Sequence, residues 1–210
     1  MITFYAYPGP NVRKVAIMLE EIAAPYAVEL VDITKGEQFK PEFLKISPNN
    51  KLPAIVDHDT PQGPQAVFET GAILIYLAEK SGRFLPAPGP RRAEAYSWLL
   101  WGLTGIGANF PQLHYFGDRA DSTPAPILDR FADETVRLFK VLETRLAAHE
   151  YLAREYSIAD MPTYASVLGM LPTVRKFRGA QIGATPSIDR WLNAIGARPA
   201  VQRGMTVPKI

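Results

Sequence analysis

The first 80 residues alternate between short strand patterns and helical patterns, and this order restricts the fold more than any other property of the chain. Residues 2–7 alternate apolar and polar side chains, which predicts a strand that ends at Pro8-Gly9-Pro10. From Asn11, a competent helix N-cap, apolar residues recur with helical period as far as Ile22. The patterns that follow predict a strand over 26–33, a short helix over 41–46, strands over 54–57 and 65–68, and a helix that starts at Glu69-Thr70.

The order of these elements predicts how the strands pair. A strand-helix-strand unit requires a parallel pair with a right-handed crossover. The strands over 54–57 and 65–68 are joined by a short turn, so we expect them to pair antiparallel. This is the thioredoxin-like arrangement, and we expect a mixed four-stranded sheet in a domain over residues 1–80.

Beyond this domain the sequence contains no strand pattern. Residues 81–90 are dense in proline and glycine, which predicts a linker. A helix opens at Ser157, where Ser157 and Asp160 form a capping box, and Pro162 is expected to remove one helical hydrogen bond. Further helices are predicted over about 91–116, 125–149 and 186–197. We therefore expect an all-helical domain over residues 91–210.

Composition excludes several classes of protein. Cysteine is absent, which rules out disulfides, thiolate metal sites and any enzyme whose own thiol is the nucleophile. The three histidines, His58, His114 and His149, are isolated, so we expect no metal site. A formal net charge of +2 with acidic and basic residues interspersed gives no large field for nucleic acid.

The apolar segments are short. The longest uninterrupted apolar run, residues 72–78, is far below the roughly 20 residues that a membrane span requires. The first residues also lack the charged and apolar regions of a signal peptide. We expect a soluble, cytoplasmic protein without a membrane partner.

The segment from Lys51 to Gly71 places backbone hydrogen-bonding groups near an anion site. Pro53 precedes an apolar strand, and the hairpin that follows leads back to Glu69-Thr70 at a helix start. Free N–H groups and the positive end of the helix dipole favour an anion there. This arrangement suits a small peptide-like ligand with a free carboxylate.

Three long stretches, residues 35–44, 46–57 and 68–74, resemble the bacterial Nu class of glutathione transferases and its fungal relatives. The order of the two domains resembles that superfamily over essentially the whole chain. The resemblance implies a homodimer with glutathione bound in each subunit, in a cleft with contributions from both. It also implies an enzyme that reduces disulfide bonds with glutathione, with weaker conjugating or peroxidase activity.

The resemblance also implies which residues hold glutathione. Pro53 is expected to follow a cis peptide bond, so that the backbone of Leu52 pairs with the cysteine portion of the ligand. Thr70 suits the carboxylate of the γ-glutamyl group and Glu69 its ammonium. The residues alone leave simpler interpretations open, because Pro53 could be an ordinary turn proline and Glu69 and Thr70 a plain helix cap.

Three more residues complete the implied binding site. Gln38 and Lys51 are positioned in the family pattern to hold the glycine end of glutathione. Arg130 lies on the helix that the family uses to close the site. The alternatives are a solvated Lys51 and a surface pair between Arg130 and Glu134 at i,i+4.

The catalytic position departs from the family pattern. Related enzymes place a Ser, Thr or Tyr hydroxyl near the end of the first strand, and this chain has Gly9 where many Nu members have Thr. Asn11, a partner of the glutathione sulfur in this class, remains as the predicted catalytic residue, with the helix cap as its alternative role. Lowering a thiol pKa from about 8.5 by about two units needs about 3 kcal/mol, of which a helix N-terminus supplies up to about 1 kcal/mol. Tyr7 is the alternative hydroxyl donor, or else a packing residue.

These residues support a main hypothesis and two rivals. In the main hypothesis the thiolate of bound glutathione, held by Asn11 and the helix N-terminus, attacks a small disulfide or electrophile, and the protein itself contributes no thiol. One rival is a conjugating or dehalogenating transferase. The other is a non-catalytic glutathione-binding protein with a regulatory or scaffold role, which Gly9 motivates.

Overall fold

The computed structural model describes residues 1–120 and 122–209, which form two compact units. The first unit contains Met1–Leu85 together with the C-terminal segment from Ala197 onward, and the second is Pro86–Gly196. The division after Leu85 falls within the predicted linker at 81–90. The C-terminal segment differs from expectation, since it packs with the first unit although it was predicted as part of the helical domain.

The first unit contains the predicted mixed sheet. Strands β1 (Ile2–Ala6), β2 (Tyr26–Leu30), β3 (Ala54–Asp57) and β4 (Gln65–Phe68) lie in the order β2-β1-β3-β4. The β1–β2 pair is parallel and the β3–β4 pair antiparallel, as predicted, and the structure adds that β1 and β3 pair antiparallel. The fold is therefore thioredoxin-like. The strand predicted over 26–33 stops at Leu30, because Asp32 accepts a hydrogen bond from the N–H of Thr34 and starts a 3₁₀ turn, η1 (Ile33–Lys35).

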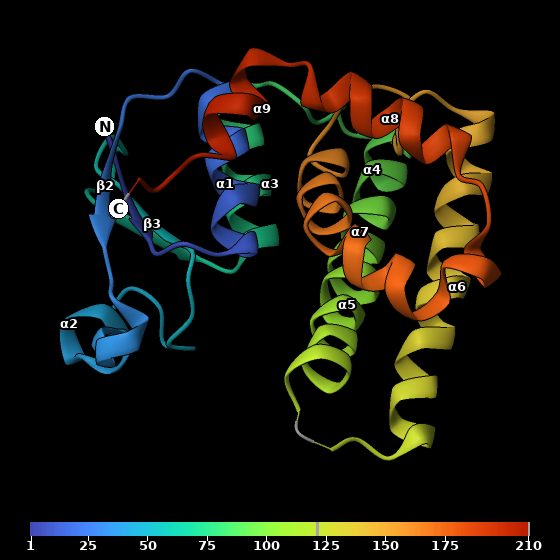
Figure 1. Cartoon of the computed structure of the whole chain (residues 1–210). Coiled ribbons are helices and arrows are strands. Elements are labelled where there is room, and N and C mark those ends of the chain that lie inside the picture. Colours follow the sequence, from blue (N-terminus) through green and yellow to red (C-terminus); the bar gives the residue numbers. More distant parts are fainter. Residues whose placement is uncertain (121, 210) are drawn as a thin grey trace. The chain divides into compact units, whose positions relative to one another are not determined.

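Helices and turns of the first unit cover the sheet (Figure 1). They are α1 (Pro10–Glu21), η2 (Glu37–Phe39), α2 (Pro41–Leu44), α3 (Thr70–Ser81) and α9 (Pro199–Gly204). The alternation predicted for the first strand is confirmed, because Ile2, Phe4 and Ala6 are buried. Tyr5 points to the other face, where its ring lies 6.0 Å from that of Phe43 on α2.

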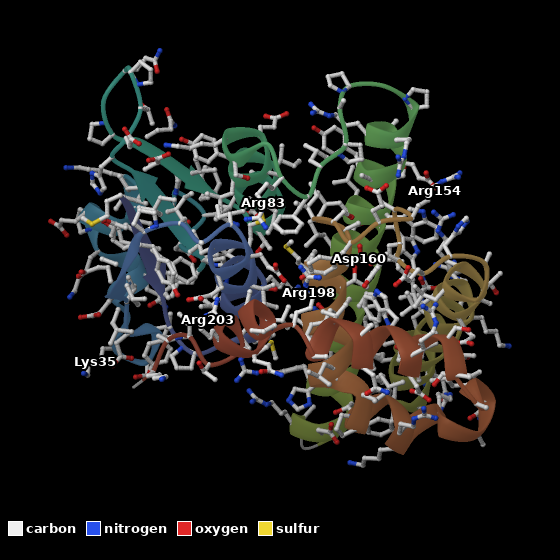
Figure 2. All side chains as sticks on the ribbon, turned by 90° about the horizontal axis from the view of Figure 1, so that it is seen from above. Lys35, Arg83, Arg154, Asp160, Arg198 and Arg203 are labelled. Atoms are coloured by element: carbon white, nitrogen blue, oxygen red, sulfur yellow. The ribbon has the colours of Figure 1, made fainter. Side chains whose placement is uncertain are left out.

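Helix α9 is attached to α1 by ion pairs and by a close backbone approach. Arg198 donates hydrogen bonds of 2.6 and 2.9 Å to Glu21, and Arg203 donates one of 2.6 Å to Glu20; both arginines are labelled in Figure 2. A Cβ added to Gly204 would lie 2.7 Å from the Cα of Ile17 in α1. These contacts explain why the C-terminal segment belongs to the first unit.

The second unit is helical. Its helices are α4 (Pro90–Trp101), α5 (Gly107–His114), α6 (Ala125–Ala148), α7 (Asp160–Ile182) and α8 (Pro186–Gly196), and the π-helical turns η3 (Gly102–Ile106) and η4 (Tyr115–Arg119) extend α4 and α5. Helices α5, α6 and α7 pack against one another. No helix in the described part of the chain is long and apolar enough to span a membrane.

The capping box before α7 is confirmed. The Asp160 carboxylate accepts a hydrogen bond of 3.1 Å from the N–H of Ser157, while Ser157 Oγ accepts one of 3.2 Å from the N–H of Ala159. Asp160, labelled in Figure 2, is buried and also accepts bonds of 2.9 Å from Leu152 N–H and from Trp191 Nε1–H. Because Pro162 has no N–H for the carbonyl of Ile158, the regular helix begins at Asp160 and not at Ser157.

Candidate functional site

A pocket of about 230 Å³ lies at the N-terminal end of α1. Its walls come from the turn after β1, the first turn of α1, the η1–η2 segment and the loop before β3. The residues singled out from the sequence that line it are Tyr7, Gly9, Asn11, Gln38, Lys51 and Leu52. Segments more than 40 positions apart in the chain thus meet in one concave site.

The N-terminal end of α1, which is the positive end of the helix dipole, faces this pocket. Gly9 is the N-cap, with an extended backbone (φ 177°, ψ 158°) and no side-chain cap, and Pro10 occupies the first helical position. The first turn contains no acidic residue. The N–H groups of Asn11 and Val12, both lining the pocket, therefore have no acceptor within the helix and remain available for an anion.

The prediction that Asn11 caps this helix is wrong. Proline is favoured at the first helical position, because its fixed φ suits the helix and its missing N–H would have no partner there. Pro10 takes that position, so the cap falls on Gly9 and Asn11 becomes the second helical residue. The Asn11 side chain is thereby free for another role.

That side chain is held by a lysine that sequence analysis missed. Lys14 Nζ donates a hydrogen bond of 2.9 Å to Asn11 Oδ1. Lys14 is only 2 % exposed, and burial lowers the pKa of its ammonium to about 8. The available signal was a lysine one turn after Asn11 and directly before the apolar run of residues 15–19 in the same helix.

Gly9 is required neither by the backbone conformation nor by packing. An extended residue with φ 177° accepts any side chain. An added Cβ would have the carbonyl oxygen of Tyr7 as its nearest neighbour, at an ordinary contact distance of 3.8 Å. Neither the backbone nor the packing therefore explains why position 9 lacks a hydroxyl-bearing side chain.

The loop before β3 forms the opposite wall. The Leu52–Pro53 peptide bond is cis, which confirms the expectation drawn from the resemblance. The carbonyl of Lys51 accepts a hydrogen bond of 2.9 Å from Ser47 Oγ, which ties down the loop. Across the pocket, Gln38 Oε1 is buried and has no hydrogen-bond partner among the described residues. A buried unpaired acceptor is costly, and a ligand with a donor group would satisfy it.

The start of α3 offers a second set of free N–H groups. Glu69 is the N-cap and Thr70 the first helical residue, as predicted. Glu69 has φ 70°, an uncommon conformation for a residue other than glycine, and its side chain does not cap the helix. Its carboxylate instead accepts a 3.0 Å bond from Asn49 Nδ2. Neither residue lines the 230 Å³ pocket, but this bond links the start of α3 to the loop that forms one of its walls.

Arg130 lies on α6 in the second unit and is not one of the pocket residues. Its alternative role, a surface pair with Glu134, is present only as a weak charge interaction that helps to lower the pKa of Glu134, with no ion pair between the two among the described residues. The hydrogen bonds that Glu134 accepts, of 2.7 and 2.8 Å, come from Arg137. A role of Arg130 in ligand binding stays a prediction from the resemblance.

Metal chemistry has no visible site in the described part of the chain. Within residues 1–120 and 122–209, no group of three or more His, Asp or Glu side chains gathers in a way that could hold a metal ion.

Comparisons with known proteins identify relatives over nearly the whole chain. Residues 1–79 match the family model described as "Glutathione S-transferase, N-terminal domain". The chain is 41 % identical to the disulfide-bond oxidoreductase YfcG of Escherichia coli, over 98 % of this chain and 94 % of that protein. A glutathione transferase family member from Pseudomonas fluorescens, solved with two glutathione molecules bound, aligns with a TM-score of 0.92 and 40 % identity over 99 % of this chain and 93 % of that one. A glutathione transferase from Pseudomonas putida, with one glutathione disulfide bound per subunit, aligns with a TM-score of 0.92 and 37 % identity over 99 % and 91 % of the two chains.

Proposed function

This chain belongs to the glutathione transferase family, and from that premise we propose that it binds glutathione at the N-terminal end of α1 and uses it to reduce disulfide bonds. Relatives named as disulfide-bond oxidoreductases, and solved relatives that bind glutathione or its disulfide, support both parts of the proposal.

The observation that carries the proposal is the composition of the 230 Å³ pocket. It combines the uncapped start of α1 with the Asn11 amide, an unpaired acceptor on Gln38 and the backbone of Leu52. Free N–H groups and an amide suit an anionic sulfur, while the acceptor and backbone suit the amides of a short peptide. The pocket is smaller than the usual size of about 300 to 1,000 Å³, so it accommodates only part of a tripeptide.

The remaining contacts assign the two ends of glutathione. The γ-glutamyl end lies at the start of α3, where Thr70 N–H and hydroxyl hold its carboxylate and Glu69 attracts its ammonium. Gln38 and Lys51 hold the glycine end, and Pro53 orients the backbone of Leu52. Arg130 provides a further contact on the basis of the resemblance alone.

The reaction is a pair of thiol–disulfide exchanges. The thiolate, stabilised by Asn11 and the N–H groups of α1, attacks one sulfur of the substrate disulfide, and the other sulfur leaves as a thiolate that takes up a proton. A second glutathione thiolate then attacks the mixed disulfide and releases the second substrate thiol. Two glutathione molecules are oxidised to one glutathione disulfide, and the substrate takes up the two electrons. The protein binds the reactants, orients them and stabilises the anion.

The proposal extends to the oligomeric state, the location and the side activities of the protein, and it leaves one alternative enzyme class. The protein acts as a homodimer in the cytoplasm, as the resemblance implies. Weaker conjugation or peroxidase activity would use the same thiolate against an electrophilic carbon or a peroxide. A conjugating or dehalogenating transferase is the alternative within the same chemistry.

Gly9 favours one rival, a protein that binds glutathione without efficient catalysis. The site has no hydroxyl at this position to donate to the sulfur, although a side chain would fit. Regulatory or scaffold roles would need the binding residues alone.

Retention on immobilised glutathione and turnover separate these proposals. Wild type, Asn11→Ala and the matched control Asn193→Ala, an exposed asparagine on α8, are each assayed with a small mixed disulfide and with an aryl halide. We expect all three to be retained, and Asn11→Ala to lose at least about tenfold in disulfide turnover, equivalent to 1.4 kcal/mol of transition-state stabilisation.

Each of the other outcomes would contradict a different part of the proposed function or support one of its rivals. Absence of retention would overturn glutathione binding. Retention of a wild type without turnover supports the binding protein, whereas faster turnover of the aryl halide supports the conjugating enzyme. Disulfide turnover unaffected by Asn11→Ala would contradict the role of Asn11 but not the family.

A further inference from the structure

Lys14 is buried next to the proposed sulfur site but does not line it. It lies three positions after Asn11 on α1, which places the two side chains on one face of the helix. Its Nζ donates a 2.9 Å hydrogen bond to Asn11 Oδ1, and the residue is 2 % exposed. Asn11, by contrast, is exposed and lines the pocket. Lys14 can therefore reach a ligand only through Asn11.

A buried ammonium with one neutral partner is energetically unfavourable. Lysines are almost never fully buried unless they are paired with a carboxylate. In residues 1–120 and 122–209, the Asn11 amide is the one hydrogen-bond partner of Lys14 Nζ. Burial lowers the pKa of this ammonium to about 8, so the group is still mainly charged at neutral pH. An apolar side chain of the same length would fill the space without this cost, which indicates a role other than packing.

The hydrogen bond determines which way the Asn11 amide faces. An ammonium can only donate, so it selects the amide oxygen, Oδ1. The oxygen and nitrogen of an amide point in different directions from the same carbon. Because Oδ1 faces the buried Lys14, the two N–H donors of Nδ2 point away from Lys14. Because Asn11 lines the pocket, those donors are available to an anion in it. Donation from a charged group to Oδ1 also polarises the amide and strengthens its N–H groups as donors.

We propose that Lys14 is a positioning residue, which fixes the Asn11 amide with its Nδ2 donors toward the glutathione sulfur and adds positive charge behind it. This inference rests on the proposed function, because it assigns a role toward the thiolate held there. It also explains how a site with Gly9 in place of a hydroxyl residue stabilises an anionic sulfur. The missing donor is replaced by an amide that a buried cation orients and polarises.

Two substitutions separate orientation from packing. Lys14→Met keeps an unbranched apolar chain as far as the Cε position and removes the ammonium with its charge and hydrogen bond, and Lys14→Gln retains a neutral donor for Oδ1. For each variant and for wild type, the affinity for glutathione is measured by calorimetry. The pKa of the bound thiol is measured from the ultraviolet absorbance of the thiolate, and kcat for a mixed disulfide is measured across pH.

Lys14→Met is expected to fold, to bind glutathione within about threefold of wild type, and to raise the pKa of the bound thiol by about one unit. Its kcat at neutral pH should fall about tenfold, with the loss recovered as the pH rises. Lys14→Gln should retain part of the effect, because it still orients the amide. A residue that serves only packing would change stability without moving the thiol pKa.

A double variant tests whether Lys14 acts through Asn11. If it does, Lys14→Met should add little to the loss already caused by Asn11→Ala, because the amide to be oriented is gone. Fully additive effects would overturn the inference. A thiol pKa unchanged in Lys14→Met, or loss of folding in both Lys14 variants, would also overturn it. Failure of the wild type itself to bind glutathione would instead overturn the proposed function.

Discussion

At the residue scale, three neighbouring positions on and before α1 determine the proposed chemistry. Gly9 lacks a hydroxyl, Asn11 provides the amide, and Lys14 holds that amide from behind. Gly9 and Asn11 were recognised from the sequence through the resemblance. Lys14 was missed because its place one turn after Asn11 is only a weak signal, and the burial of a lysine depends on the elements packed around it.

Gly9→Thr tests whether the missing hydroxyl limits the rate. The extended backbone and the 3.8 Å clearance of an added Cβ allow the substitution without strain. A hydrogen bond to the thiolate is worth about 1.5 to 3 kcal/mol, so kcat for disulfide reduction should rise about tenfold or more. Gly9→Val, with the same shape and no hydroxyl, is the matched control. An equal gain in Gly9→Val, or a fall in Gly9→Thr, would contradict a role for the hydroxyl.

Lys14→Met should stabilise the folded protein at neutral pH while it slows the enzyme. Burial lowers the Lys14 pKa from 10.5 to about 8, and each unit corresponds to 1.36 kcal/mol, so the buried charge costs about 3 kcal/mol. Between pH 8 and 10.5 the unfolded chain binds the proton and the folded chain does not, so this group makes stability rise with pH in that window. Denaturant unfolding across pH should show a rise in wild type that is smaller in Lys14→Met. A variant less stable than wild type at neutral pH would indicate a structural role.

At the element scale, the sequence patterns correctly predicted those helices and strands whose formation depends mainly on residues close together in the chain. The hairpin strands 54–57 and 65–68 agree with β3 and β4, because alternation and a short turn suffice to specify them. The helix predicted from about 125 to 149 agrees with α6 within a residue. The cis bond before Pro53 came from the resemblance, since only about 5 to 6 % of X-Pro bonds are cis and physical reasoning favours trans.

The start of α7 depends on one buried carboxylate. Asp160 accepts hydrogen bonds from two backbone N–H groups, the Trp191 indole and Ser157 Oγ, and burial raises its pKa to about 6 in spite of these bonds. Asp160→Asn replaces one acceptor oxygen with a donor, so at least one buried N–H loses its partner. We expect a loss of about 3 kcal/mol in the free energy of unfolding at neutral pH, measured in urea.

The matched control for this change is Asp189→Asn on the exposed start of α8, which should cost less than about 1 kcal/mol. The raised pKa adds a pH dependence. Because the folded state favours the protonated carboxyl, the contribution of Asp160 to stability should fall as pH rises from about 4 to about 6. This pH dependence should be absent from Asp160→Asn. Equal effects of the two substitutions would show that the buried network is not needed.

The contact between α9 and α1 was beyond local patterns, since the residues of one of its ion pairs are 177 positions apart. Gly204→Ala would bring a Cβ to 2.7 Å from the backbone of Ile17, which cannot move as a side chain would. A loss of about 1 to 3 kcal/mol in unfolding free energy is expected. Gly169→Ala on α7, with no atom within 4 Å of the added Cβ, should be neutral or slightly stabilising. Similar effects of the two changes would contradict the close approach.

At the scale of the whole molecule, the chain is a thioredoxin-like unit and a helical unit, as the order of sequence patterns predicted. The pocket that carries the proposed function lies within the first unit, where Gly9 and Asn11 meet Gln38, Lys51 and Leu52. Physical reasoning from residues alone reached a cleft for a carboxylate-bearing peptide. Naming its ligand required the family, because an anion site at a helix start fits many ligands.

The pKa of glutathione's thiol when bound to the full-length protein tests the proposed mechanism most directly. It is measured by titrating the ultraviolet absorbance of the thiolate at saturating glutathione. If Asn11, with Lys14 behind it, and the start of α1 stabilise the anion, the bound pKa should lie about two units below the free value of about 8.5, and Asn11→Ala should return most of the difference. A bound thiol that titrates at its free value in the wild type would contradict the mechanism.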